Sequence, residues 1–142
     1  NVVLKAAAAM KKVDPSVKVG GPAWKQPWVA SASDFLRTAA GQLDFISFHL
    51  YGGAPGDGDV ATTLRRATNL GPASDDLRRR MKEATSRPLE LFHDEWNIAW
   101  SGPDDRMTGL LGAAFDALGL ASIAQSEADG AAVWNESDGW YG

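Results

Sequence analysis

Apolar positions along the chain recur with two spacings, one typical of helices and one of short buried strands. The helical spacing predicts helices over residues 2–13, 34–40, 60–85 and 107–128, the third broken near Gly71-Pro72. Ser33 is the candidate N-cap of the second helix. Short apolar runs predict strands over residues 17–23, 44–51, 89–100 and 130–134. Because strands and helices alternate, the sequence predicts an α/β fold with a parallel sheet.

The predicted strand over residues 44–51 has one apolar and one mixed face. Ile46, Phe48 and Leu50 alternate with Ser47, His49 and Tyr51. We expect the apolar face to pack against helices, because an unpaired imidazole or hydroxyl there would cost a few kcal/mol. Ser47, His49 and Tyr51 are therefore expected to line a pocket on the opposite face.

The stretch from Leu89 to Trp100 begins apolar and gathers polar side chains toward its C-terminal end. Strict alternation would place His93 and Glu95 on one face of the strand and Asp94 on the other. A strand that ends in carboxylates, an imidazole and an indole is typical of the rim of an α/β barrel or a sheet crevice. Taken by itself, this stretch fits a solvated strand end equally well.

Four strands are too few for a closed barrel of eight strands and about 250 residues. The pattern therefore leaves two architectures, a small open doubly wound sheet or half of a barrel. A flavodoxin-like nucleotide-binding module is disfavoured, because Gly20-Gly21-Pro22 lacks the spaced glycines of a phosphate loop and Pro22 has no amide N–H.

Composition limits the classes of partner. The 142 residues correspond to about one domain, with a net charge of −4 from 14 basic and 18 acidic residues. The triplet Arg78–Arg80 has acids nearby and is interpreted as a solvated helix face, so neither nucleic acid nor membrane is an expected partner. The chain has no cysteine and six tryptophans, whose faces suit sugar rings or the core. The compartment stays open between secreted and cytoplasmic.

No metal or other cofactor is expected. His93, Asp94 and Glu95 are consecutive, and neighbouring strand residues point to opposite faces, so the three side chains do not converge easily on one ion.

Three motifs together resemble the C-terminal half of clan A glycoside hydrolases, and most closely glycoside hydrolase family 39, the β-xylosidase and α-iduronidase group. They are Asp14 to Ala23 (DPSVKVGGPA), Asp44 to Tyr51 (DFISFHLY) and Asp94 to Ile98 (DEWNI). The resemblance covers nearly the whole chain and implies strands five to eight of a (β/α)8 TIM barrel, with residues 1–142 forming half of a catalytic domain.

The resemblance also implies roles for individual residues. Glu95, in a Glu-aromatic-Asn setting, corresponds to the nucleophile of a retaining β-xylosidase-like O-glycoside hydrolase. His49 and Tyr51 would contact the sugar or hydrogen-bond the nucleophile. Trp96 and Asn97 would shape the same rim, and Trp134 would correspond to the aromatic platform under the reactive sugar.

One part of the family pattern is absent. The acid/base glutamate belongs to a Trp-Asn-Glu-Pro-like motif on strand four, which would precede Asn1. Trp134-Asn135-Glu136-Ser137 imitates that motif but follows the nucleophile strand, which makes Glu136 only a minor candidate. The chain is therefore interpreted as a catalytically incomplete fragment that acts on a glycoside or oligosaccharide. Its expected protein partner is the missing N-terminal half, or a second copy paired through open sheet edges. The alternative is a non-catalytic carbohydrate-binding remnant.

Overall fold

A three-stranded parallel sheet forms the centre of the computed structural model, which describes residues 2–28 and 31–134. The strands lie in the order β1 (Phe45–Gly53), β2 (Glu90–Ala99) and β3 (Gly130–Val133). The helices are α1 (Val2–Val13), α2 (Ala32–Ala39), α3 (Val60–Ala67), α4 (Leu70–Ala84) and α5 (Leu110–Ala124), with a 3-10 turn η1 (Ala40–Gln42) after α2. The predicted α/β class and parallel sheet are confirmed.

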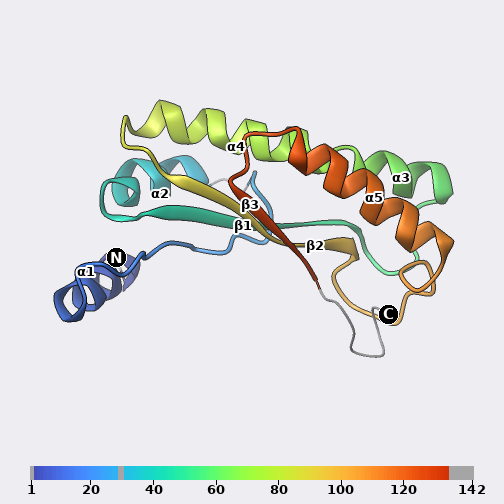
Figure 1. Cartoon of the computed structure of the whole chain (residues 1–142), viewed down its shortest axis with the longest axis horizontal. Coiled ribbons are helices and arrows are strands. Elements are labelled where there is room, and N and C mark those ends of the chain that lie inside the picture. Colours follow the sequence, from blue (N-terminus) through green and yellow to red (C-terminus); the bar gives the residue numbers. More distant parts are fainter. Residues whose placement is uncertain (1, 29–30, 135–142) are drawn as a thin grey trace.

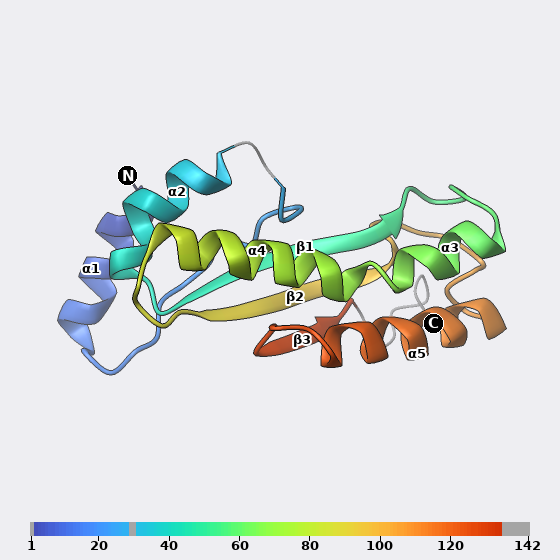
Figure 2. The same ribbon diagram turned by 90° about the horizontal axis from the view of Figure 1, so that it is seen from above.

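Helices cover one face of the sheet. Figure 1 shows α3, α4 and α5 above the strands, and Figure 2 shows α4 beside α5 across the same face. Within residues 2–28 and 31–134, no helix packs on the opposite face of the strands. A doubly wound sheet carries helices on both faces, so this arrangement favours part of a barrel. None of the described helices is both long and apolar enough to cross a membrane.

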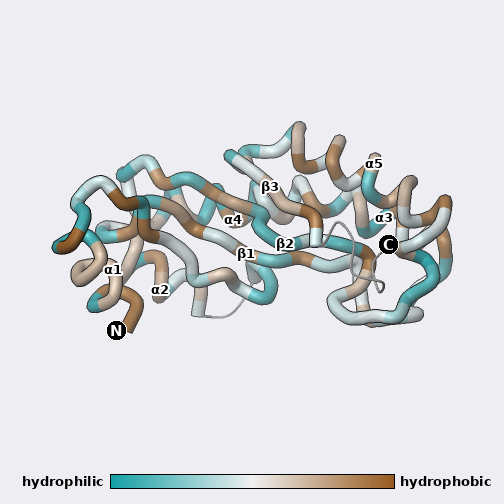
Figure 3. Tube along the Cα trace, turned by 60° about the horizontal axis from the view of Figure 1, so that its bottom comes forward, coloured by the Kyte–Doolittle hydropathy of each residue, from teal (hydrophilic) through white to brown (hydrophobic). Residues whose placement is uncertain are grey.

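The core lies between the sheet and the helices. Ile46, Phe48 and Leu50 of β1 are all buried there, as their alternation predicted. From β2 the core receives Leu91, and from α4 it receives Leu77, both with no exposed surface. Figure 3 shows a hydrophilic, teal stretch of the tube at β2, where the polar residues of this strand collect.

The segment predicted as a strand over residues 17–23 is not a continuous strand. This segment runs beside β1. Two isolated parallel bridges join the two, one between Gly20 and Phe45 and one, just beyond the predicted range, between Trp24 and Phe48. Gly21 and Ala23 have φ angles of 122° and 57°, which interrupt an extended backbone, and Pro22 has no N–H to donate.

Some predicted helix boundaries are displaced. The helix expected over residues 60–85 breaks at Thr68 and Asn69 and not at Gly71-Pro72, because Pro72 occupies the first turn of α4, where its missing N–H costs nothing. Ser33 lies inside α2 and does not cap it. The last helix is α5, shorter than the predicted range of 107–128.

The arginine triplet of α4 is only partly a solvated face. The side chain of Arg79 is 60% exposed, but those of Arg78 and Arg80 are 11% and 16% exposed. Arg78 reaches the carboxylate of Asp129 before β3, and Arg80 donates to the carbonyl of Pro27. These two guanidinium groups therefore join α4 to neighbouring segments.

Candidate active site

A β-bulge in β2 determines which side chains meet at the polar end of the sheet. Phe48 of β1 pairs with His93, but the next residue, His49, pairs with Glu95, so Asp94 is an extra residue on β2. A bulge of this kind reverses the alternation of the strand beyond it. The expectation that Glu95 shares a face with His93 is therefore wrong. His93 faces the helices, and Glu95 faces the uncovered side of the sheet.

Glu95 has a polar partner near each carboxylate oxygen. The hydroxyl of Tyr51 donates to Oε1, and Nδ1 of His49 lies 3.1 Å from Oε2. Both partners belong to β1, on the face that the alternation predicted for them. The structure thus brings together three of the predicted site residues, Glu95, His49 and Tyr51.

Asp94 joins this cluster from the other side of the imidazole. Its Oδ1 lies 3.6 Å from Nε2 of His49, an ion-pair separation longer than a hydrogen bond. Burial raises the pKa of Asp94, while a hydrogen bond with Ser47 and the charge of His49 act in the opposite direction. Strict alternation along the strand separates Asp94 from Glu95, so the sequence did not identify Asp94 as a neighbour of His49. The consecutive His-Asp-Glu letters gave no signal of the bulge.

Two acids and one imidazole do not make a metal site here. Among the described residues, no group of three or more His, Asp or Glu side chains is arranged to hold an ion. His93, which precedes Asp94 and Glu95 in the sequence, is buried and stacks on Phe48 with ring centroids 4.3 Å apart. Burial lowers the pKa of His93 to about 3, so it stays neutral at physiological pH.

The structure does not place Trp96 at the rim. Its side chain is 1% exposed and packs toward α5, where its ring centroid lies 6.3 Å from that of Phe115. A Cβ at Gly119 would lie 2.7 Å from the Trp96 ring, so this glycine makes room for the indole. Trp96 therefore contributes to the core behind Glu95.

Asn97 and Trp134 join the ends of β2 and β3. The Asn97 side chain is buried, donates from Nδ2 to the carbonyl of Trp134 and accepts at Oδ1 from the amide of Ile98 at 2.6 Å. The amide of Trp134 donates to the carbonyl of Trp96 at 2.9 Å. Asn97 thus holds the backbone at Trp134, whose residue surface is 43% exposed. Glu136 lies outside the described residues.

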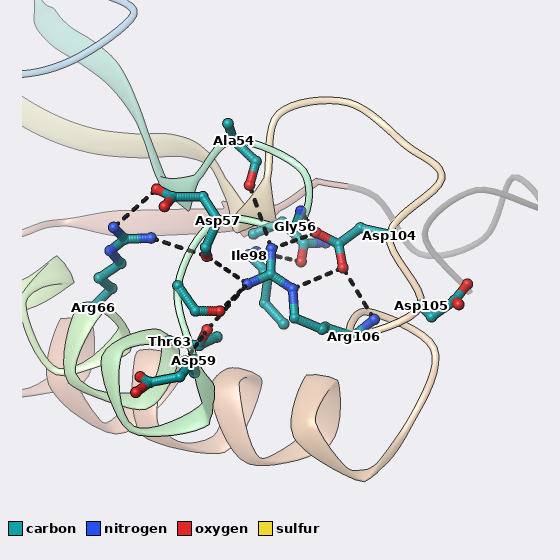
Figure 4. Close-up of polar contacts among 12 residues, drawn as sticks. Ala54, Gly56, Asp57, Asp59, Thr63, Arg66, Ile98, Asp104, Asp105 and Arg106 are labelled. Atoms are coloured by element: carbon teal, nitrogen blue, oxygen red, sulfur yellow. Dashed lines mark hydrogen bonds and ion pairs between the residues drawn. The ribbon is translucent and has the colours of Figure 1, made fainter.

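The loops that follow β1 and β2 are joined by one arginine (Figure 4). The guanidinium of Arg106 donates to the carbonyls of Ala54 at 3.4 Å and Asp57 at 2.6 Å, and pairs with the carboxylate of Asp104. Asp104 is 7% exposed and also accepts from the amide of Gly56 at 2.9 Å. Its hydrogen bond with Arg106 is the main reason that the pKa of Asp104 falls to about 2. This network fixes the loops beyond the strand ends that carry Tyr51 and Glu95.

Two hollows adjoin the sheet. One of about 590 Å³ lies on the uncovered face and is lined by Asp94 together with Phe45, Ser47, Phe92 and residues 130–132. A larger one of about 950 Å³ lies at the N-terminal strand ends, among ion pairs such as Lys18 with Glu90. In TIM barrels that end serves stability and the opposite end serves chemistry. Glu95, His49 and Tyr51 lie toward the C-terminal ends of the strands, where TIM barrels have their active sites.

Of the two tryptophans that the sequence left undecided, Trp24 is a core residue. Its exposed fraction is 9%, and it meets Phe35 edge-on at 5.4 Å. Trp28 is 51% exposed and Trp100, after β2, is 50% exposed. Trp100 follows β2, Trp134 follows β3, and Trp28 follows the strand-like segment beside β1. All three leave part of the indole exposed near the C-terminal ends of these segments.

Known proteins match both the sequence and the fold. Over 103 residues the chain is 35% identical to a β-xylosidase of Caldicellulosiruptor saccharolyticus, a match that covers 70% of this chain and 20% of that protein. A glucosidase structure from Croceicoccus marinus matches 98% of the chain and 28% of its own length, with a TM-score of 0.74 and 24% identity. A monomeric β-xylosidase structure from Caulobacter crescentus matches 88% of the chain and 27% of its own, with a TM-score of 0.62 and 21% identity.

These matches establish the fold and the family. The structural neighbours carry the same α/β architecture, in agreement with part of a TIM barrel. The chain spans about a fifth of the β-xylosidase that it matches in sequence and less than a third of either solved structure. Residues 1–134 match the sequence profile described as "Glycosyl hydrolases family 39". The chain belongs to this family.

Proposed function

We propose that this chain supplies the nucleophile of a retaining O-glycoside hydrolase that acts on β-xylosides, and that Glu95 is the nucleophile. Membership of family 39 supports hydrolysis of a glycosidic bond, and the 35% identical relative named as a β-xylosidase supports a xyloside as substrate. We use the term parent enzyme for a protein that contains this chain together with the rest of the barrel.

The observation that carries the proposal is the pair of polar partners on Glu95. Tyr51 and His49 reach its two carboxylate oxygens from the neighbouring strand, near the strand ends where barrel enzymes bind substrate. Contacts at both carboxylate oxygens restrict the carboxylate to one orientation. An oriented carboxylate can attack an anomeric carbon without first giving up rotational freedom.

The reaction then follows two steps. Glu95 attacks the anomeric carbon, the glycosidic C–O bond breaks, and a second carboxyl group protonates the departing oxygen. In the second step that group takes a proton from water, and the water oxygen displaces Glu95 from the sugar. Each step inverts the anomeric centre, so the product retains the starting configuration.

Asp94 does not fit the role of the second carboxyl group. The two nitrogens of an imidazole point in different directions, and His49 lies between Asp94 and Glu95. Asp94 also lines the hollow together with Ser47 and Phe92, deeper in the sheet than the rim. We therefore place the acid/base on strand four, in the half of the parent enzyme that this chain does not contain. That half would also cover the open sheet face.

Replacement of Glu95 by Gln in the parent enzyme tests the assignment. With an aryl β-xyloside as substrate, we expect Glu95→Gln to lower kcat by a factor on the order of 10⁴ or more. Glu90→Gln is the matched control, since Glu90 lies at the start of the same strand and pairs with the exposed Lys18. Retention of activity by Glu95→Gln would exclude Glu95 as nucleophile.

A carbohydrate-binding protein without catalysis is the second candidate, and the half-exposed Trp28, Trp100 and Trp134 favour it. Xylo-oligosaccharide binding separates the two functions when it is measured by calorimetry on both variants. A parent protein that binds but does not hydrolyse, with equal affinity before and after Glu95→Gln, would support the binding function.

A further inference from the structure

We propose that the ion pair between Asp104 and Arg106 positions Trp100, and that Trp100 contacts the leaving group of the substrate. The inference rests on the proposed function, in which Glu95 attacks the terminal sugar of a β-xyloside. It makes Trp100 a specificity-determining residue, and it makes Asp104 and Arg106 a positioning pair that acts through Trp100.

Trp100 lies at the outer edge of the site. It directly follows Ala99, the last residue of β2, which is paired with the end of β1. Its half-exposed indole lies near Lys25, whose Nζ is 5.7 Å from the ring centroid. Lys25 follows the strand-like segment on one side of β1, and β2 lies on the other side. This contact therefore spans the C-terminal end of β1, the strand that carries His49 and Tyr51.

The indole surface of Trp100 suits a sugar beyond the cleaved bond. Glu95 bonds the terminal sugar in the proposed reaction, so the remainder of a β-xyloside is the leaving group. Trp100 comes after Glu95 and beyond the paired part of β2, and it is half-exposed, whereas Glu95 is partly buried. Flat apolar faces such as indole pack well against sugar rings. A xylose unit of the leaving group is therefore the ligand that we assign to Trp100.

Asp104 fixes the loop that carries Trp100. Its buried carboxylate accepts from the amide of Gly56, in the loop after β1, at 2.9 Å and from the amide of Arg106 at 3.1 Å. The segment from Trp100 to Asp104 is short, and both of its ends are held, one by the strand pairing at Ala99 and one by these hydrogen bonds. A short loop with both ends held has few conformations, which restricts the directions that the indole can take.

Arg106 ties the carboxylate of Asp104 to the segment that follows β1 (Figure 4). Its Nε lies 2.8 Å from Oδ1 of Asp104, and the same guanidinium donates to the carbonyl of Asp57 at 2.6 Å and to the hydroxyl of Thr63 at 3.2 Å. Most of the Arg106 side chain is buried, so water competes little for these donors. The planar fork of an arginine can reach a carboxylate and other acceptors at the same time, and a lysine cannot. The two loops at the strand ends are therefore held together by this one side chain and the carboxylate it binds.

Two substrates that differ in the size of the leaving group test the role of Trp100 in the parent enzyme. Cleavage of xylotriose at its terminal sugar releases xylobiose, whose rings extend beyond the cleaved bond. Cleavage of β-xylosyl fluoride releases a single fluoride ion, which is too small to stack on an indole. We expect Trp100→Ala to lower kcat/KM about tenfold more for xylotriose than for β-xylosyl fluoride. An equal loss on both substrates, or no loss on xylotriose, would overturn the inference.

Arg106→Lys tests the positioning pair with the same ratio of kcat/KM values, xylotriose over β-xylosyl fluoride. We expect the ratio to fall about threefold, because lysine keeps the charge and loses the fork that joins the loops. Arg66→Lys is the matched control and should leave the ratio unchanged, since Arg66 pairs with Asp57 of the loop after β1 and not with the loop after β2 in the described part of the chain. A merely structural role of Arg106 would lower both kcat/KM values equally, and that result would overturn the inference.

A double-mutant cycle shows whether Arg106 acts through the indole. Once Trp100→Ala is present, Arg106→Lys should leave the xylotriose-to-fluoride ratio where it is. A further threefold fall in that background would mean that Arg106 acts on the site by another route, and it would overturn the positioning role.

A measurement on the unmodified parent enzyme covers the case in which Arg106→Lys does not fold. Hydrogen–deuterium exchange followed by peptide mass spectrometry reports how firmly the loops are held before any sugar is added. We expect slow exchange at the amides of Gly56 and Arg106, which donate to Asp104, and fast exchange there would contradict the inference. If Glu95→Gln abolishes hydrolysis of both substrates while these tests fail, the proposed function stands and only the roles of Trp100 and its positioning pair fall.

Discussion

Nδ1 of His49 lies 3.1 Å from Oε2 of Glu95, although strict alternation along β2 would turn Glu95 toward the helices. The contact exists because Asp94 is inserted as a bulge opposite the step from Phe48 to His49. Bulges occur next to active sites, where they redirect a side chain. In this chain the bulge brings the Glu95 carboxylate to Tyr51 and His49 and leaves Trp96 in the core.

The hydroxyl of Tyr51 should matter for rate and little for stability. Tyr51→Phe removes the donor to Oε1 of Glu95 while keeping the ring. A hydrogen bond to a charged group contributes about 1.5–3 kcal/mol, so we expect kcat to fall about 10- to 100-fold. Steady-state kinetics of the parent enzyme measure this, with the melting temperature as control. An unchanged kcat would show that Tyr51 does not assist the nucleophile.

His93 should make the folded state sensitive to acid. Burial lowers its pKa in the folded state to about 3, below the value near 6.5 of an unfolded chain. Between those values the unfolded state binds the extra proton, so this residue removes up to about 1.4 kcal/mol of stability for each unit that the pH falls. His93→Phe should reduce that dependence, because a phenyl ring can stack on Phe48 without titrating. Urea denaturation between pH 7 and pH 4 measures both slopes, and equal slopes would contradict the account.

Arg106 should be worth more to stability than an exposed arginine. Arg106→Lys keeps the charge but cannot reach Ala54, Asp57 and the buried Asp104 together. We expect a loss of about 2 kcal/mol in the free energy of unfolding, since Asp104 stays buried with fewer donors. Arg79→Lys is the control and should cost less than about 0.5 kcal/mol, because Arg79 pairs on the surface. Chemical denaturation of both variants compares them, and equal losses would refute the special role of Arg106.

The chain by itself should associate with other copies. The sheet face that carries Phe45 and Phe92 has no covering helix among the described residues, and β3 leaves an unpaired edge. We expect sedimentation velocity of residues 1–142 to show dimers or larger species, and the N-terminal half of the parent enzyme to suppress them. A monodisperse monomer that unfolds cooperatively would contradict this expectation.

The sequence predicted much of the fold from local patterns. The alternation of Ile46, Phe48 and Leu50 identified the helix-facing side of β1, and the apolar runs located β2 and β3 within a few residues. It did not predict the broken strand over residues 17–23, because two isolated bridges depend on where β1 runs and on the φ angles of Gly21 and Ala23.

The sequence identified several residues of the site correctly, but it did not predict how they are arranged. Glu95, His49 and Tyr51 do meet, whereas Trp96 was expected at the rim and lies in the core. Both the Trp96 placement and the missed approach of Asp94 to His49 trace to the bulge. A bulge is a property of two paired strands, so the spacing of residues in one strand does not reveal it.

If Glu95 is the nucleophile, it forms a covalent bond to the sugar in each catalytic cycle. Incubation of the parent enzyme with a 2-fluoro-β-xyloside that carries a good leaving group, followed by intact-mass and peptide analysis, tests it directly. We expect a mass increase of one fluoroxylosyl group on the peptide that contains Glu95, and none after Glu95→Gln. Labelling at another carboxylate would contradict the assignment of Glu95 as the nucleophile. So would the absence of labelling in an enzyme that still hydrolyses the corresponding xyloside without fluorine.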